Sequence, residues 1–267
     1  MKENIDYTIQ SFPSSRIFTS DVGRIGLSKH HVKALIEVDV TEARKKIKVK
    51  RTESGDNISF TSWILKCISH AMTEHKQVHA LKKGKNKLII FNDIDLSIIV
   101  EKEVEGVLVP LPLVIREVNK KSLNDIYSEI ENAKMKIIEN ENNYVIEHNR
   151  KKEGINIFLL LPQYIRLIIW KILLHNPYRV KKMMGTAAVT SIGMIGKIDG
   201  WIIPYSIHPV CFALGSIIKK PGVINNSIEI REYLKMTILI DHDVIDGAPA
   251  ARFVSHLTDC IENSYAL

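Results

Sequence analysis

LIDHDVIDGAPAARF, the segment Leu239–Phe253, places a histidine between two aspartates where an apolar run ends and a run of small residues begins. The preceding residues favour a buried strand, and Asp246 with Gly247 favours a tight turn into a final helix over Ala248–Asn263. Folds often present functional side chains where a strand ends beside a turn. His242 is therefore a candidate catalytic base, a candidate metal ligand or an ordinary buried histidine.

The metal interpretation of this segment is disfavoured by backbone geometry. Three aspartates and a histidine within six residues have the chemistry of a divalent cation site. On an extended chain, however, Asp241 and Asp243 point away from His242, so the ligands do not converge. A single neighbouring carboxylate can instead orient the imidazole or raise its pKa, and either effect suits a base. We expect no metal at this segment, while spacing alone leaves the base and the buried histidine open.

The rest of the chain mixes strands and helices without a regular alternation. Strands are expected at Val32–Val40, Lys87–Ile90, Asp95–Val100, after a turn at Glu105 and Gly106, in the strand and turn of Gly185–Gly196, and at Phe212–Ile218 and Lys235–Ile240. Helices are expected after Thr41 as N-cap, over Phe60–His75 with Thr61 or Ser62 as cap, and after Ser122 with Asp125 completing a capping box. This order predicts an α/β fold, an α+β sandwich with a mixed sheet flanked by helices.

Composition indicates one folded unit. The chain has 267 residues, of which 45% are apolar and 25% charged. We expect residues 1–14 to form an N-terminal arm and residues 15–267 to form the folded domain. The formal charge of +7 suits an anionic partner such as a nucleotide-bearing cofactor. Its basic runs lie at residues 43–51 and 81–87 without interleaved aromatic residues, which argues for exposed loops and helix ends and against a nucleic-acid partner. Gly-rich phosphate loops of the GxGxxG and GxxxxGK[ST] types are absent.

The three cysteines and the N-terminus indicate a compartment. Cys67, Cys211 and Cys260 are odd in number, far apart and without CxxC spacing. This pattern favours a reducing compartment and predicts neither a disulfide framework nor a zinc site. The first ten residues contain no apolar run typical of a secretory signal. We therefore expect a cytoplasmic protein.

One apolar segment needs a separate interpretation. INIFLLLPQYIRLIIWKILL, residues 155–174, is nearly long enough to cross a bilayer, but it contains Arg166 and Lys171. Charges in the middle of a span are costly in lipid. A helix from about Pro162 to Leu174, packed in the core or at a subunit interface, is the expected structure. Membrane-surface contact through Phe158–Leu174 remains an alternative, and a spanning helix is the least favoured.

Five segments in order resemble one enzyme family. DHDVIDGAPAARF resembles the DH-x-x-x-DG-A-x-A-A-R-F signature of the dihydrolipoyl acyltransferase catalytic domain of 2-oxo acid dehydrogenase complexes, a family that shares its fold with chloramphenicol acetyltransferase. The other resembling segments are EVDVT, GVLVPLPLVIREVNKKSLNDI, GTAAVTSIGMIG and IIPYSIHPVCFALG. The resemblance extends over roughly Ser15–Glu262 and implies a chloramphenicol-acetyltransferase-like fold.

The resemblance also implies a mechanism and an assembly. It identifies His242 as the general base and Thr190 as the hydroxyl that donates to the oxyanion, with Ser191 expected on the other side of the strand. It gives Asp246 the task of holding the active-site turn. It implies coenzyme A as acyl carrier, with binding residues unknown, a small-molecule acceptor, and a homotrimer whose active site takes the histidine from one chain and the hydroxyl from its neighbour. A non-catalytic trimeric scaffold is the alternative.

Three departures from the family pattern qualify what the resemblance implies. The sequence shows no lipoyl domain and no lipoylation motif, so we expect a free-standing enzyme or a core subunit served by a separate lipoyl carrier protein. Asp243 stands where the family usually has arginine. The stretch Phe158–Lys182 is longer and more apolar than the corresponding family linker. Each departure indicates a change in the acyl donor, in the acyl acceptor, or in the contacts of the chain with its neighbours in a trimer or with a membrane.

Overall fold

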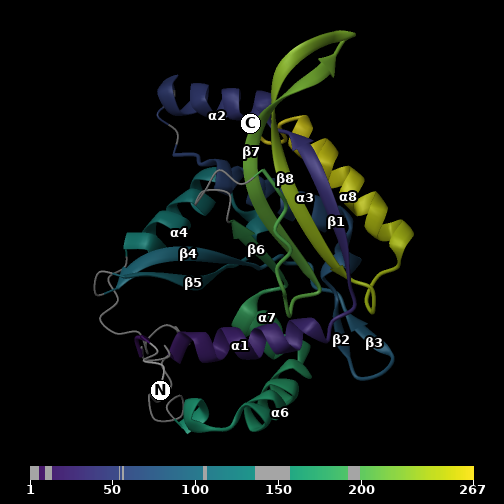
Figure 1. Ribbon diagram of the computed structural model, residues 1–267. Helices are drawn as coiled ribbons and strands as arrows, with labels where there is room; N and C mark the ends of the chain where they lie inside the picture. Colours follow the sequence, from purple (N-terminus) through teal and green to yellow (C-terminus); the bar gives the residue numbers. More distant parts are fainter. Residues whose placement is uncertain are drawn as a thin grey trace.

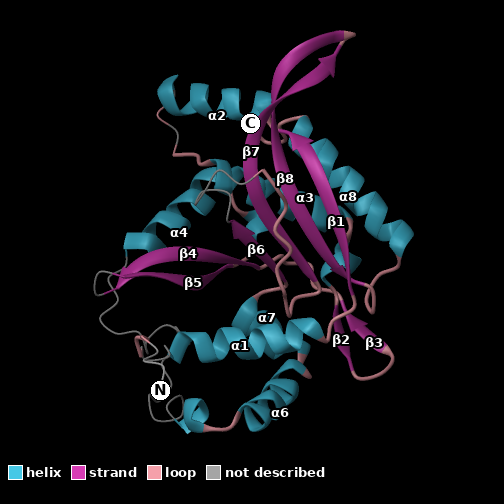
Figure 2. Ribbon diagram, viewed as in Figure 1, coloured by secondary structure: helices cyan, strands magenta, loops and turns pink. Residues whose placement is uncertain are grey.

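A mixed six-stranded sheet forms the centre of the molecule (Figures 1 and 2). The computed structural model describes residues 6–9, 14–53, 55, 57–104, 107–135, 157–191 and 199–267. The strand order is β1-β8-β7-β6-β4-β5. Strand β6 runs parallel to both of its neighbours, and the remaining pairs are antiparallel. The bounds are β1 His31–Asp39, β4 Leu96–Val104, β5 Val107–Ile115, β6 Ala187–Ser191, β7 Val210–Ile224 and β8 Ser227–Asp241.

Four helices bury their apolar sides against one face of this sheet. They are α2 Thr41–Glu53, α3 Phe60–Glu74, α4 Leu123–Met135 and α8 Gly247–Glu262. Helix α3 supplies the fully buried Trp63, and α8 supplies Phe253, which meets Phe212 of β7 at 6.1 Å between ring centroids. The alternating residues of β8 that face this layer are Leu234, Met236, Ile238 and Ile240. The expected α+β sandwich with a mixed sheet is confirmed.

The opposite face of the central strands is partly covered by the segment 199–209. The indole Nε1 of Trp201 donates to the carbonyl of Ile36 on β1 at 2.9 Å, and the Lys235 ammonium of β8 lies 4.2 Å from the centre of the Trp201 ring. Further along this segment, the imidazole of His208 bonds the carbonyl of Met184 at 2.9 Å. The contact with Trp201 covers Lys235 of β8 on the face that lacks the helix layer.

Helix capping follows the sequence only in part. The capping box of Ser122 and Asp125 at α4 is confirmed. Helix α3, by contrast, is capped by Ser59, whose hydroxyl accepts from the N–H of Ser62 at 3.0 Å. The expectation of Thr61 or Ser62 as cap is wrong, because the helix begins earlier and Ser62 completes the box. Thr41 is the first residue of α2, and its hydroxyl donates to Asp39 at 2.6 Å.

Several elements were not expected from the sequence. Residues 14–27, which follow the expected N-terminal arm and for which no helix is expected, form helix α1 Ser14–Leu27. The strand expected at Lys87–Ile90 is confirmed as β3 Lys87–Ile89. The basic run before it, expected as an exposed loop or helix end, forms the partner strand β2 Leu81–Lys83, and the turn between the two uses Gly84 at φ +65°. Helix α7 Pro177–Met184 and the short 3-10 helices Lys76–His79 and Val118–Lys120 complete the set. The expected turns at Glu105 and Gly106 and after Ser191 lie outside the described residues.

Helix α6, Gln163–Leu174, lies with α1 away from the central sheet (Figure 1). Its bounds confirm the predicted helix. Of the two expected positions, the core is wrong, because none of its residues belongs to the core cluster, and the subunit interface stays a prediction. Its buried residues are Arg166 and Trp170, while Tyr164, Ile168 and Ile172 are exposed. Arg166 is buried because its guanidinium pairs with Asp21 of α1 at 2.8 Å. Among the described residues, no helix combines the length and apolar character needed to cross a membrane.

Candidate active site

His242 lies in the turn that joins β8 to α8. Strand β8 ends at Asp241, and the N–H of His242 donates to the carbonyl of His30 at 2.9 Å, just before β1. The backbone of the histidine is therefore anchored to a neighbouring strand, while its side chain is exposed. The buried-histidine interpretation is wrong, because this side chain projects from the end of the sheet.

Asp241 holds the turn in place, a role that the sequence did not assign to it. Its carboxylate is 1% exposed and accepts from the Lys29 ammonium at 2.7 Å and from the N–H of Asp243 at 3.2 Å. Its carbonyl accepts from the N–H of Val244 at 3.0 Å. A buried carboxylate needs such partners to stay ionised. The sequence feature that could have indicated this role of Asp241 is Lys29, which lies just before β1. Strands β1 and β8 are neighbours, so the start of β1 lies beside the end of β8.

Asp243 faces a histidine rather than leaving an unopposed negative charge beside His242. Its carboxylate lies 3.0 Å from Nδ1 of His30. This hydrogen bond raises the pKa of His30 above its usual range and lowers the pKa of Asp243 below its own. Asp243, expected to stand in place of an arginine, is thus paired with a histidine from the residues just before β1.

His208 fixes the neighbouring loop with a neutral imidazole. Its Nε2 bonds the carbonyl of Met184 at 2.9 Å, and its Nδ1 lies 3.3 Å from the hydroxyl of Ser206. Its own carbonyl lies 2.9 Å from Nε2 of His31. Burial lowers the pKa of His208 to about 4, so the ring stays neutral at neutral pH. These hydrogen bonds connect the start of β1 to the segment 206–208 and to the end of α7.

Thr190 lies in the middle of the sheet on β6. Val189 belongs to the core on the helix side, so Thr190 faces the opposite side and Ser191 returns to the helix side, as expected from strand alternation. On that opposite side Thr190 is aligned with Ala213 and Thr237 across β7 and β8. Thr190 is partly exposed.

Thr190 and His242 are not brought together within one chain. Thr190 aligns with Thr237, five residues before His242 on β8 and two strands away. With about 3.4 Å per residue along a strand and about 4.8 Å between strands, the two positions are separated by roughly 20 Å. A base and an oxyanion donor must both lie about 3 Å from the reacting atoms. These two residues of one chain therefore do not serve the same reacting group.

Asp246 begins helix α8. Its carbonyl accepts from the N–H of Ala250 at 3.1 Å, but its exposed side chain makes no capping bond to the helix. Gly247 does not take a left-handed conformation, and an added Cβ there meets no atom within 4 Å. The expected turn before α8 is present, but the expectation that Gly247 allows it through its conformational freedom is wrong, because Gly247 has no left-handed backbone here.

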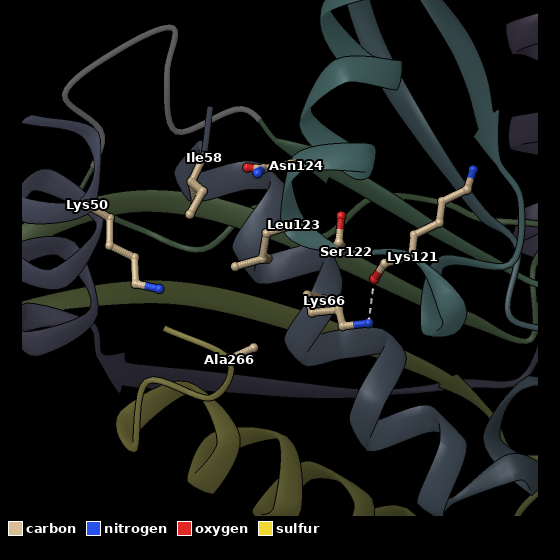
Figure 3. A pocket seen from close by; sticks show the side chains of 8 residues that line it. All are labelled: Lys50, Ile58, Lys66, Lys121, Ser122, Leu123, Asn124 and Ala266. Carbon is tan, nitrogen blue, oxygen red and sulfur yellow. Dashed lines mark hydrogen bonds between the residues drawn. The ribbon is translucent and has the colours of Figure 1, made fainter. Parts of the chain in front are cut away.

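A basic pocket lies on the helix layer, apart from these residues (Figure 3). Its volume is about 300 Å³, and it opens between α2, α3, α4 and the C-terminus. The Lys66 ammonium, at its floor, donates to the carbonyl of Lys121 at 2.6 Å. Its lining residues are Lys50, Ile58, Lys66, Lys121, Ser122, Leu123, Asn124 and Ala266. None of the predicted site residues lines it.

Comparison with protein families gives one match. The model of the family described as 2-oxoacid dehydrogenases acyltransferase (catalytic domain) matches residues 27–143 and 178–267. The matched part includes β6 and the turn between β8 and α8. The unmatched part includes α6 and nearly all of α1.

Curated relatives carry the same domain within longer chains. The chain is 25% identical over 239 residues to the lipoamide acyltransferase component of the branched-chain alpha-keto acid dehydrogenase complex of Bacillus subtilis, covering 87% of this chain and 47% of the relative. It is 26% identical over 239 residues to the dihydrolipoyllysine-residue acetyltransferase component of the pyruvate dehydrogenase complex of Corynebacterium glutamicum, covering 86% and 30%. The chain thus spans half or less of these relatives.

Solved structures agree on the fold. The dihydrolipoamide acetyltransferase of Azotobacter vinelandii superposes with a TM-score of 0.67 at 20% identity, covering 96% of this chain and 92% of that one. That enzyme was investigated for the roles of a serine, a histidine and an asparagine in its catalytic mechanism. Chloramphenicol acetyltransferase superposes with a TM-score of 0.51 at 13% identity, covering 99% of each chain. The expected chloramphenicol-acetyltransferase-like fold is confirmed.

Proposed function

The chain belongs to the family of 2-oxoacid dehydrogenase acyltransferase catalytic domains, and from this premise we propose that it transfers an acyl group between coenzyme A and a second acceptor. The observation that carries the proposal is the exposed His242, anchored by its backbone where β8 ends. An exposed imidazole whose backbone is held in place is suited to proton transfer.

In the proposed reaction His242 removes the proton from the attacking thiol, hydroxyl or amine. The nucleophile then adds to the acyl carbonyl, whose π electrons move to oxygen and form a tetrahedral oxyanion. Collapse of this intermediate re-forms the carbonyl and breaks the bond to the leaving thiolate, for instance that of coenzyme A. The leaving thiolate takes the proton back from the imidazolium, so the base is regenerated and the proton balance closes.

Thr190 is the proposed oxyanion donor. The serine, histidine and asparagine studied in the Azotobacter enzyme have the same separations along the chain as Thr190, His242 and Asp246 here. A threonine hydroxyl replaces a serine hydroxyl without loss of the donor. Removal of one oxyanion donor typically costs about 3–4 kcal/mol of barrier.

Asp246 is the proposed positioning residue in this site. Its place at the start of α8, four residues after His242, suits a carboxylate that accepts hydrogen bonds from the active-site turn of a neighbouring chain or from substrate. This role is separate from proton transfer.

A homotrimer resolves the separation of the two proposed catalytic residues. Since Thr190 and His242 lie roughly 20 Å apart in one chain, a complete site needs the histidine of one chain and the hydroxyl of the next. The similarity to the cubic core of a pyruvate dehydrogenase complex, at a TM-score of 0.67, is compatible with such an arrangement.

The first test measures acyl transfer with purified protein, acyl-CoA donors of several chain lengths and thiol, amine and alcohol acceptors. His242→Ala is expected to lower kcat by about 100-fold or more, since general base catalysis contributes that much or more. His175→Ala provides a matched control, because that histidine is also exposed but ends α6. Full activity in His242→Ala would refute the proposal.

The identity of the acceptor needs its own experiment. Curated relatives are named for transfer involving dihydrolipoyllysine residues, so a lipoyl group on a separate carrier protein is the second acceptor class to test. Rates with free dihydrolipoamide and with an isolated lipoylated domain are compared at equal concentration. A non-catalytic scaffold, the alternative function, predicts no turnover with either and no calorimetric signal on titration with coenzyme A.

A further inference from the structure

A cluster of soft and borderline metal-binding side chains lies on the helix layer, on the face of the sheet opposite Thr190. The side chains are His70 from α3 and His256 and Cys260 from α8. One nitrogen from each ring and the sulfur all lie within 4.8 Å of one another. His70 lies nearly two hundred positions before the other two residues in sequence, so the fold brings it to them.

The two helices position this cluster firmly. His256 and Cys260 are four residues apart on α8 and therefore point to the same side of the helix. The ring of His70 stacks on Tyr265 with 4.0 Å between centroids, which fixes its plane. The Tyr265 carbonyl in turn accepts from the indole of the fully buried Trp63 at 2.9 Å. Two of the three side chains thus come from one helix face, and the third is held by the C-terminal turn.

The geometry needs only a small contraction to become a tetrahedral site. Zinc bonds of about 2.0–2.1 Å to nitrogen and 2.3 Å to sulfur place tetrahedral ligand atoms about 3.3–3.6 Å apart. The three atoms here lie within 4.8 Å of one another, so side-chain rotations close the difference. A fourth position is within reach of His75, whose ring lies 5.3 Å from that of His256, centroid to centroid.

The surroundings of the cluster suit a bound cation. Hydrogen bonds to the rings of His70, His75 and His256 are absent among the residues that the structure describes. Carboxylates of Glu74 and Asp259 lie close enough to influence the cluster electrostatically. Two imidazoles and one thiolate form a donor set that suits zinc rather than magnesium or calcium.

We propose that His70, His256 and Cys260 form a binding site for a zinc-class transition-metal ion that joins the C-terminal helix to α3. The metal would be structural: it lies on the helix layer, whereas Thr190 faces the other side of the sheet. Its effect on the active site is indirect, because the helix it clamps begins immediately after Asp246. Metal binding to the folded chain adds to folding stability by mass action.

Cobalt substitution tests the site without any measurement of activity. Chelator-treated full-length protein is titrated with Co²⁺ and followed by absorption spectroscopy. A thiolate ligand is expected to produce a sulfur-to-cobalt charge-transfer band in the near ultraviolet, and a tetrahedral site produces visible ligand-field bands. Zn²⁺ should displace the cobalt and abolish both bands at one equivalent, whereas Mg²⁺ should not.

Variants assign the ligands. Cys260→Ala is expected to remove the charge-transfer band, and His256→Ala or His70→Asn to weaken zinc binding by more than about 100-fold, since loss of a ligand should exceed the effect of an outer-shell partner. Cys211→Ala is the matched control, because Cys211 is a buried cysteine in β7 away from the cluster. Circular dichroism checks the fold of each variant. His242→Ala should retain the bands, which separates this proposal from the catalytic one.

Two results would overturn the proposal. The first is the absence of a charge-transfer band in the wild-type protein together with no rise in Tm on addition of Zn²⁺. The second is a band that survives in Cys260→Ala but disappears in Cys211→Ala or Cys67→Ala, which would place the thiolate elsewhere. Either result would leave the three side chains as a packing cluster between two helices.

Discussion

Burial of His79 makes the free energy of unfolding depend on pH. Its side chain is fully buried in the short helix Lys76–His79, and both ring nitrogens lack a hydrogen-bond partner among the described residues. Burial lowers its pKa to about 4, as it does for His208. An unfolded histidine binds a proton near pH 6.5, so the unfolded chain holds more protons than the folded chain between these two values.

Stability is therefore expected to fall as the pH decreases from about 6.5 to about 4, and to be fully present above that window. Each of the two histidines contributes on the order of 3 kcal/mol to this loss. His79→Leu removes one titrating ring and its unpaired nitrogens, so its free energy of unfolding should depend less steeply on pH. Urea denaturation at pH 7.5, 6 and 5 measures the slope. The exposed His175→Leu is the control, and an unchanged slope in His79→Leu would contradict the argument.

At the scale of elements, α1 and α6 pack against each other, and almost none of their residues lie in the part of the chain that the family model matches. The buried Asp21 of α1 accepts from the Arg166 guanidinium of α6 at 2.8 Å and 3.0 Å, and Phe18 stacks on Phe158 at 5.5 Å between centroids. A lone apolar pattern predicts a core helix for α6. Arg166, whose charge argues against a membrane span, is the residue that attaches α6 to α1 through Asp21.

Loss of one partner of this buried ion pair leaves an uncompensated charge. Asp21→Ala is expected to destabilise the α1–α6 pair by about 3–5 kcal/mol. Limited proteolysis should then cut within residues 157–174 at an increased rate, while the central sheet stays protected. Glu131→Ala, which breaks the exposed pair of Glu131 and Lys134, is the control, with an effect of at most about 1 kcal/mol. Equal protection of α6 in Asp21→Ala and wild type would disprove the role of the pair.

The exposed apolar side of α6 keeps the membrane-contact hypothesis testable. Tyr164, Ile168 and Ile172 are 66%, 57% and 63% exposed and follow one another at four-residue spacing, beside the basic Lys171. If this side contacts lipid, the protein should float with vesicles that contain anionic lipid at low salt, and Ile168→Asp should abolish flotation. Absence of wild-type protein from the vesicle fraction would end the hypothesis and leave this side for contact with another protein chain.

At the scale of the whole molecule, the separation of Thr190 from His242 makes a prediction about mixed assemblies. Thr190→Val and His242→Ala should each be nearly inactive as pure oligomers. Oligomers formed by co-expression of the two variants should regain part of the activity, because some interfaces then combine an intact hydroxyl with an intact histidine. Light scattering on the same samples reports the oligomeric state. No regain in mixed trimers would contradict a site shared between chains.

Much of the fold follows from local sequence pattern. Alternation in β1 and β8, the apolar face of α3 and the Ser122 capping box are set by neighbours within a few residues, and all were predicted. Helix α1 is missed, because its place depends on contacts with a distant segment, such as Asp21 with Arg166, that no local window contains. Strand β2 is missed because its basic residues resemble an exposed loop, although it pairs with the predicted strand β3.

The sequence by itself determined the family, the mixed sandwich, and the position of His242 at a turn after a buried strand. These depend on side-chain periodicity and on motif order, which are properties of the linear chain. The tertiary structure alone decided that Asp241 and Lys29 hold this turn, that Thr190 lies roughly 20 Å from His242, and that His70 meets His256 and Cys260. Each of these depends on which strands and helices become neighbours, and that choice is made by burial of the whole core rather than by any one segment.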